Sequence, residues 1–402
     1  MRHSERIDAR RQRRELIYLA PGDVSKGRVE PILWMRTCEA YAQQGLNVTL
    51  MSLRIRRPDS IRPGEVWEHF GLERSFRIAQ FPTMLKHDGS VAAFRLWAVA
   101  AASAAAGLCS ARSVAFRASP IVHARAPVLL APFIGLKRVL PRGSRPRIVF
   151  ETHALPTQQS AWVVRQSDLV VVNSQALAAD LADAFGIPSA RLLYAPLPPH
   201  NLVHPEPRDH ARAAIGVSPS DTIACYTGKM TREHNEFLLA TAAEVAPRIE
   251  RFRMLLVGGN PSIVDWTRSR MDSMRLRNTV ILTGFVPPAK ISAYQSAADV
   301  LLYHMPETMG NFAYTTPAKG FEYQAVERPI VATDFPLFHE VFGDDGERAI
   351  RVRDRTPVGL ADGIVRALGL GDDGRAMTGR AASFVRGRTW QRRATQILEA
   401  LG

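Results

Sequence analysis

Short apolar runs alternate with longer amphipathic stretches along almost the whole chain. A continuous apolar run is typical of a strand in a parallel sheet that is covered on both faces, whereas the longer stretches repeat their apolar positions with the period of a helix. The pattern therefore predicts two consecutive series of strands and helices. In the first series we expect strands at residues 15–20, 46–53, 76–81, 121–124, 147–152, 168–172 and 191–195. In the second series we expect strands that begin near Thr222 and lie at 253–257, 279–283, 299–303, 329–333 and 349–352, followed by helices over 356–401.

A proline-rich segment, residues 195–207, separates the two series. Proline density without strand or helix periodicity is typical of a linker. Two such halves predict an α/β protein with two doubly wound, Rossmann-like domains, at 15–204 and at 205–385. Ligands bind such sheets beyond the carboxyl ends of the strands, so we expect the functional site in the cleft between the domains.

Composition narrows the class of protein. Hydrophobic residues make up 46% and charged residues 22% of the 402 residues, which excludes bulk disorder. The three cysteines lie far apart, which favours a reducing, cytoplasmic location over a zinc site or a disulfide framework. Residues 91–108 are apolar but rich in alanine and interrupted by Arg95, so we expect a buried or half-buried helix and not a membrane span. Residues 1–14 hold six arginines without an apolar run, which predicts a basic flexible arm and not a signal peptide.

The net charge of +14 is unevenly distributed. Residues 1–204 carry 27 basic and 15 acidic side chains, whereas residues 205–402 carry 25 and 23. A positive field favours an anionic partner. The excess is sharpest at 86–147, where the basic face either docks a phosphorylated acceptor or anionic lipid headgroups, or is a solvated surface. Nucleic acid is not expected, because the region lacks interleaved aromatic residues and any known binding module.

The most informative stretch is residues 315–334, TTPAKGFEYQAVERPIVATD. Thr316 can cap a helix whose first residue is Pro317, and the free N–H groups of such a helix start form an anion site suited to a diphosphate. Glu322, in the second turn, can accept hydrogen bonds from both hydroxyls of a ribose. An ordinary capped helix followed by a strand explains the same spacing.

A set of ordered motifs resembles glycosyltransferase family 4, whose members have the GT-B fold. The donor-binding signature of this family is similar to the run Pro317-x-Lys319-x-x-Glu322-Tyr323-x-Ala325-x-x-x-Pro329. Shorter matches are CYTGK at 225–229, VILTGFV at 280–286, AAD at 297–299, FETH at 150–153 and SDLVVVNS at 167–174. The matched region spans residues 15 to about 390. Each motif is weak alone, but their order is specific.

The resemblance implies a retaining glycosyltransferase that uses a nucleotide-diphosphate sugar of the UDP or GDP type, without a metal or other cofactor. The C-terminal domain would bind the donor and the N-terminal domain the acceptor, which could be anionic or lipid-linked, as in polysaccharide, glycolipid or cell-envelope glycan synthesis. The last helix, at 386–402, would pack back on the N-terminal domain. The location would be cytoplasmic, with peripheral contact at the inner face of the membrane as one option.

Site residues carry over from the matching motifs. Lys229 corresponds to a cation that contacts the donor phosphates, Glu322 to the ribose-binding glutamate and His153 to a histidine that orients the transferred sugar. We assign these three as catalytic. Further donor-binding candidates, from the resemblance and from local patterns, are Gly27 in the first loop, Gly228, His234, Val286 beside the base, Thr315, Thr316 and Lys319.

Two positions depart from the family pattern. His234 stands where a second basic residue is usual, so Arg232 or a protonated His234 would have to replace it. Tyr314 stands eight residues before Glu322, where the family has its first glutamate; Glu307 begins a similar Glu-x-x-Gly but lies too far from Glu322 without an insertion. These departures keep a second hypothesis open, a weak or inactive GT-B-like binding or scaffold subunit. An inverting enzyme or an epimerase would share the fold.

Overall fold

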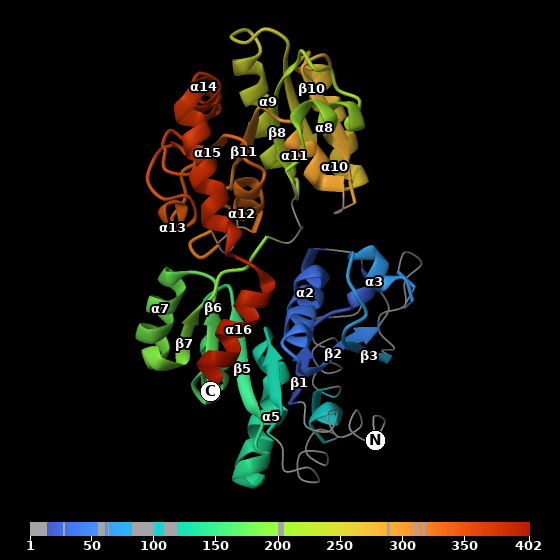
Figure 1. The fold of residues 1–402 in the computed structure, drawn as a ribbon, viewed down its shortest axis with the longest axis vertical. Coiled ribbons are helices and arrows are strands. Elements are labelled where there is room, and N and C mark those ends of the chain that lie inside the picture. The colour runs from blue at the N-terminus through green and yellow to red at the C-terminus, as the bar shows by residue number, and fades with distance from the viewer. Residues whose placement is uncertain are drawn as a thin grey trace, which may run out of the picture. The chain divides into compact units, whose positions relative to one another are not determined.

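The computed structural model describes residues 14–26, 29–54, 61–62, 64–82, 100, 102–107, 119–199, 205–287, 290–308, 312–315 and 318–402. It divides into two compact units, Met1–Pro196 with Trp390–Gly402 (unit 1) and Leu197–Thr389 (unit 2). Both units are layered α/β structures (Figure 1). The basic arm, except Arg14, and most of the expected helix at 91–108 lie outside the described residues.

Unit 1 contains a parallel seven-stranded sheet with the order β3-β2-β1-β4-β5-β6-β7. Its register places Leu16 beside Val48 on one side and Ile121 on the other. The strands are β1 (Glu15–Leu19), β2 (Asn47–Arg54), β3 (Arg77–Pro82), β4 (Ile121–Ala124), β5 (Arg147–Thr152), β6 (Leu169–Val172) and β7 (Leu192–Tyr194). The helices include α2 (Val29–Gln43), α3 (Val66–His69), α5 (Pro127–Val139), α6 (Ala161–Gln166) and α7 (Gln175–Phe185).

Unit 2 contains a parallel six-stranded sheet with the order β10-β9-β8-β11-β12-β13. Its strands are β8 (Thr222–Thr227), β9 (Phe252–Val257), β10 (Val280–Gly284), β11 (Val300–Tyr303), β12 (Ile330–Thr333) and β13 (Ile350–Val352). Its helices are α8 (Arg208–Ile215), α9 (Arg232–Val245), α10 (Pro261–Ser273), α11 (Ile291–Ser296), α12 (Ala318–Ala325), α13 (Phe338–Phe342), α14 (Pro357–Leu368) and α15 (Gly371–Arg386).

Both faces of the unit 2 sheet are covered by helices. Along β8, Ala224 and Tyr226 belong to one apolar cluster, with Leu238 of α9, whereas Ile223 and Cys225 belong to the other, with residues of α12 and α13. A strand buried on both faces has no polar side, which is why these strands are continuous apolar runs in the sequence. Every predicted strand range overlaps a strand of the structure, and the predicted α/β class with the GT-B pattern of two parallel sheets is confirmed.

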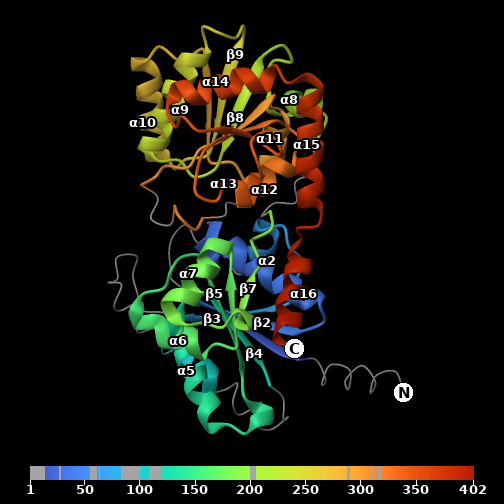
Figure 2. The same ribbon diagram turned by 90° about the vertical axis from the view of Figure 1, so that its left-hand side faces the viewer.

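The last helix, α16 (Trp390–Leu401), belongs to unit 1 although the chain reaches it from α15 of unit 2. It packs against α2, as Figure 2 shows. Its strongly amphipathic sequence buries Trp390, Ala394, Ile397 and Leu401 on one face. Arg393, on the same face, is also buried. The C-terminal helix is thus a structural part of the N-terminal domain.

Candidate active site

The carboxyl ends of β8 and β11 form the switch point of the unit 2 sheet, because the strand order reverses between these neighbours. Ligands of open α/β sheets bind at such points. Gly228 and Lys229 follow β8, and His304 follows β11. Lys319 and Glu322 come from α12. Of the predicted donor residues, Gly228, Lys229 and Lys319 thus lie close to the position where the topology predicts a ligand.

Gly228 lets two chain segments approach closely. Its φ of +136° lies in the region that favours glycine, and a Cβ atom there would overlap the Nζ and Cε atoms of Lys319. Gly258, directly after β9, has a φ of +130°, and a Cβ there would overlap the Gly228 carbonyl oxygen. The sequence analysis missed Gly258; the glycine pair that ends a buried strand, VGG at 257–259, was the available signal.

The Lys319 ammonium lies against the turn after β8. Its Nζ donates a hydrogen bond of 2.7 Å to the Tyr226 hydroxyl and lies 3.9 Å from the centre of the Tyr226 ring. The same hydroxyl donates to the Lys229 carbonyl oxygen at 3.1 Å. Burial lowers the pKa of Lys319 to about 7, although the Glu322 carboxylate acts in the opposite direction. Lys319 is thus the amine most closely integrated into the glycine turn, whereas the Lys229 side chain is exposed.

His234 lies in a buried aromatic row behind this turn. Its ring centre is 4.4 Å from that of Tyr226 and 5.1 Å from that of His304. His304 stacks on Phe237 at 3.8 Å and pairs through Nδ1 with the Thr333 hydroxyl at 3.0 Å. Burial lowers the pKa of His234 far below its ordinary value and that of His304 to about 3. The free structure thus favours neutral imidazoles at both positions, not a protonated His234.

The other candidate residues for donor binding are half-buried or exposed, or lie outside the described residues. Thr315 and Val286 are half-buried, while Gly27 and Thr316 lie outside the described residues. Glu307 is 70% exposed, and its Oε1 is 2.9 Å from the Arg355 Nε. The Glu307 carboxylate thus pairs with an arginine at the surface.

In unit 1, His153 lies at the carboxyl end of β5 within a buried ionic network. The centre of the network is Glu151, which is 2% exposed. Its Oε1 accepts from the His153 Nε2 at 2.9 Å, and its Oε2 lies 3.2 Å from the His123 Nε2 and 3.0 Å from the Arg393 Nη2. Burial raises the pKa of Glu151, but Arg393, His123 and His153 outweigh burial, so the pKa lies well below its ordinary value. The sequence analysis found His153 but not Arg393, which is remote in sequence.

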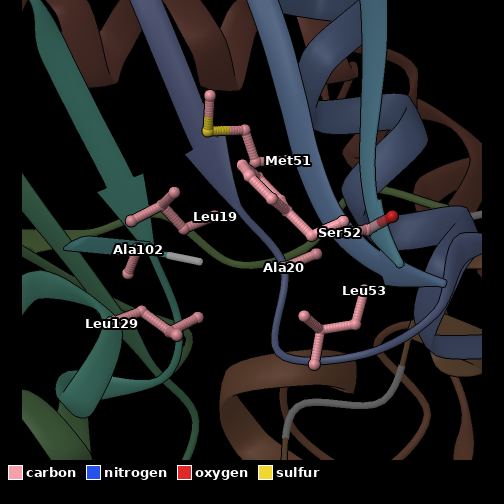
Figure 3. A pocket seen from close by; sticks show the side chains of 8 residues that line it. Leu19, Ala20, Met51, Ser52, Leu53, Ala102 and Leu129 are labelled. Atoms are coloured by element: carbon pink, nitrogen blue, oxygen red, sulfur yellow. The ribbon is translucent and has the colours of Figure 1, made fainter. Parts of the chain in front are cut away.

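An apolar pocket of about 260 Å³, including its open mouth, lies at the same edge of the unit 1 sheet (Figure 3). Residues from the carboxyl ends of β1, β2 and β3 and from the start of α5 line it: Leu19, Ala20, Met51, Ser52, Leu53, Phe81 and Leu129, with Ala102. Apart from Ser52, these side chains present only apolar atoms or weakly polar sulfur.

The expected basic face is only partly exposed. Of its described members, Lys137 pairs with Asp168, Arg145 donates to the Leu140 carbonyl oxygen, and Arg147 donates to the Leu401 carbonyl oxygen. Arg138 and Arg142 are exposed at the end of α5, beside Val139, whose exposed fraction is 77%. Lys86, Arg95, Arg112 and Arg117 lie outside the described residues. None of the helices in the described ranges is long and apolar enough to cross a bilayer.

Comparisons with known proteins agree with these motifs. Residues 221–369 match the family model described as glycosyl transferases group 1. A D-inositol 3-phosphate glycosyltransferase of Corynebacterium urealyticum is 25% identical over 252 residues, which cover 59% of this chain and 57% of the relative. A GDP-mannose-dependent alpha-(1-6)-phosphatidylinositol monomannoside mannosyltransferase of Mycolicibacterium smegmatis is 27% identical over 184 residues, 42% of this chain and 47% of the relative. The matches thus span about half the length of these curated relatives.

Solved structures share the fold over nearly the whole chain. The sucrose-phosphate synthase of Thermosynechococcus elongatus has a TM-score of 0.71 at 17% identity, with 96% of this chain and 98% of that chain covered. Anabaena HepE in complex with UDP has a TM-score of 0.69 at 14% identity, with 96% and 99% covered. At these identities the likeness establishes the fold alone. The structural likeness shows the GT-B fold, and the family match shows a domain similar to the group 1 glycosyltransferases at residues 221–369 of unit 2.

Proposed function

We propose that this chain is a retaining glycosyltransferase that moves a sugar from a nucleotide-diphosphate sugar of the UDP or GDP type to an acceptor hydroxyl. One observation carries the proposal. The glycine turn at Gly228 and the Lys319 ammonium meet at the switch point of a domain that matches the group 1 glycosyltransferases, and Glu322 lies on the same helix as Lys319. Curated relatives are named as glycosyltransferases, and a structural neighbour was solved with UDP-glucose.

Residues of unit 2 have distinct proposed roles in binding the donor and in the transfer of the sugar. Backbone N–H groups at the start of α12 and the Lys319 ammonium would hold the diphosphate, because positive charge in a partly dry site stabilises a developing anion. Lys229, exposed on the neighbouring turn, would reach the departing phosphate. Glu322 would accept hydrogen bonds from the ribose hydroxyls. With retention, an oxygen of the departing phosphate would take the acceptor proton, so no protein nucleophile is required.

The acceptor is proposed to carry an anionic or lipid-linked group. Relatives of this chain are named for inositol phosphate and phosphatidylinositol mannoside acceptors. The exposed cations Arg138 and Arg142 of unit 1 suit an anionic group on the acceptor. We propose a cytoplasmic protein that contacts the inner face of the membrane peripherally.

Donor binding is tested by thermal unfolding with UDP, GDP and ADP. A ligand that binds only the folded protein raises the melting temperature, and we expect UDP or GDP to do so. Lys319→Met should weaken binding about tenfold to a hundredfold, because it removes a cation from the diphosphate site. Lys290→Met is the matched control, since Lys290 is exposed in the same unit. Equal affinity of both variants would contradict the placement of the diphosphate.

Turnover is tested with the sugar nucleotide whose diphosphate binds best and with inositol phosphate or phosphatidylinositol as acceptors. We expect a glycosylated acceptor, an unchanged anomeric configuration by NMR and no loss of rate with EDTA. An inverted product would exclude retention, and a rate lost with EDTA and restored by a divalent metal would exclude metal independence.

A second candidate is a binding subunit with little or no turnover. It is favoured by Tyr314 in place of the usual acid and by the surface pairing of Glu307 with Arg355. Intact, Lys319-dependent binding of a sugar nucleotide without hydrolysis or transfer to any acceptor tested would favour this candidate over the enzyme.

A further inference from the structure

His153 is held from both sides by neighbouring charged groups. On one side, its Nε2 lies 2.9 Å from the Glu151 Oε1. On the other, its Nδ1 lies 2.7 Å from the Nη2 of Arg125, the residue that directly follows β4. Both ring nitrogens therefore have partners within unit 1.

The chemistry of these partners determines where the imidazole proton lies. An ionised carboxylate only accepts hydrogen bonds, so the Nε2 that faces Glu151 must carry a hydrogen. A guanidinium only donates, so the Nδ1 that faces Arg125 must present its lone pair. A second proton on Nδ1 would point at an Arg125 N–H group and would break this hydrogen bond.

We infer that Arg125 and Glu151 are positioning residues that hold His153 as a neutral imidazole with its single proton on Nε2. This inference goes beyond the proposed function and needs no donor or acceptor for its test. It assigns His153 an orienting role at the sheet edge and not the role of a proton shuttle, because both nitrogens are committed to protein groups.

The charges around the network agree with a neutral ring. Burial, followed by the charge of Arg125, lowers the pKa of His153 to about 4, although Glu151 acts in the opposite direction. The remaining groups that face Glu151 and its partners are Arg393 from α16, His123 from β4, Tyr41 from α2 and Tyr18 from β1. Burial also lowers the pKa of His123, whose Nδ1 is 3.1 Å from the Tyr41 hydroxyl. Of the two arginines in this network, Arg125 is the one that contacts the Nδ1 of His153.

The test is an imidazole ¹H–¹⁵N correlation spectrum of the ligand-free protein, labelled with ¹⁵N-histidine, across a pH titration. His153→Asn identifies the His153 signal. In the unmodified protein we expect the pattern of a ring protonated on Nε2 that titrates near pH 4. A ring protonated on Nδ1, or one that titrates in the ordinary range, would overturn the inference without any further variant.

Arg125→Met adds a second measurement. It removes the donor to Nδ1 and the nearby positive charge, so the titration of His153 should move upward by about one pH unit or more. Arg125→Lys, which keeps a donor and a charge, should restore part of the shift, and Arg138→Met at an exposed position of α5 should leave the signal unchanged. An unmoved signal in Arg125→Met would show that Arg125 does not position the ring.

Discussion

At the scale of single residues, Lys319 lies in close contact with the glycine turn of the proposed donor site. The ammonium lies where a Cβ atom of residue 228 would stand, and its hydrogen bond to Tyr226 links α12 to the end of β8. Burial makes the charged amine costly and lowers its pKa to about 7, although the Glu322 carboxylate favours the charged form. A bound diphosphate would add negative charge beside this amine and raise its pKa, so binding would be coupled to the uptake of a proton.

This coupling predicts the pH dependence of nucleotide diphosphate binding. Below pH 7 most Lys319 is already charged, so affinity gains nothing further from this group. Above pH 7 the free amine must bind a proton as the ligand enters, because the diphosphate raises its pKa; affinity should then fall with rising pH, by at most about tenfold per pH unit. Calorimetry between pH 6 and 9 measures this slope, and Lys319→Met should lack it. A slope above pH 7 that is the same in both proteins would assign it to another group.

At the scale of elements, strands were easier to predict than the contacts that hold the sites together. Strands such as β5 and β6 are covered on both faces, so burial alone makes each an apolar run. Ser174, Thr231, Asn260 and Thr356 each cap a helix through a side-chain oxygen. None of these caps was predicted, and the predicted cap, Thr316, lies outside the described residues. Arg393, in contrast, reaches Glu151 only because α16 returns to unit 1. Periodicity predicts the helix but not the distant carboxylate that its arginine contacts.

The ion pair between Arg393 and Glu151 predicts that electrostatic attraction, as well as apolar packing, holds α16 in unit 1. Arg393 is 3% exposed, its Nη2 is 3.0 Å from the Glu151 Oε2, and its Nε donates to the Ala195 carbonyl oxygen at 3.0 Å. Arg393→Met should lower the free energy of unfolding by about 3–5 kcal/mol, because it leaves a buried carboxylate short of a partner. Denaturant titration measures the loss. Gln396→Met, at an exposed position of the same helix, should change it by no more than about 0.5 kcal/mol.

A change of Glu151 tests whether Arg393 stabilises α16 through this carboxylate. In a Glu151→Gln background, Arg393→Met should cost clearly less than in the unmodified protein, since the charge that needs compensation is gone. If the cost of Arg393→Met is the same in both backgrounds, the arginine stabilises α16 through packing of its stem and not through Glu151.

At the scale of the whole molecule, the sequence was sufficient for the class of fold but not for identifying which basic side chains face solvent. Charge counts alone placed a strong positive face at 86–147. In the described part of that region, Arg125, Lys137 and Arg147 make internal contacts. A count of charges cannot distinguish arginines that bond to groups within the protein from arginines that face solvent. The groups to which the first kind bonds lie on other helices and strands, far away in the sequence. The exposed cations Arg138 and Arg142 flank Val139, an arrangement suited to an anionic lipid surface.

Peripheral membrane contact therefore predicts a salt-dependent association that centres on the end of α5. The protein should sediment with vesicles that contain phosphatidylserine at low salt, should not sediment with vesicles of phosphatidylcholine alone, and should dissociate as salt screens the charges. Each cation near the surface contributes about 1 kcal/mol, so Arg138→Glu with Arg142→Glu should weaken binding by about tenfold or more. The same charge change at Arg268 and Arg386 of unit 2, both exposed, is the control. If the two double variants lose binding equally, net charge attracts the protein to the vesicle and the end of α5 is not the contact.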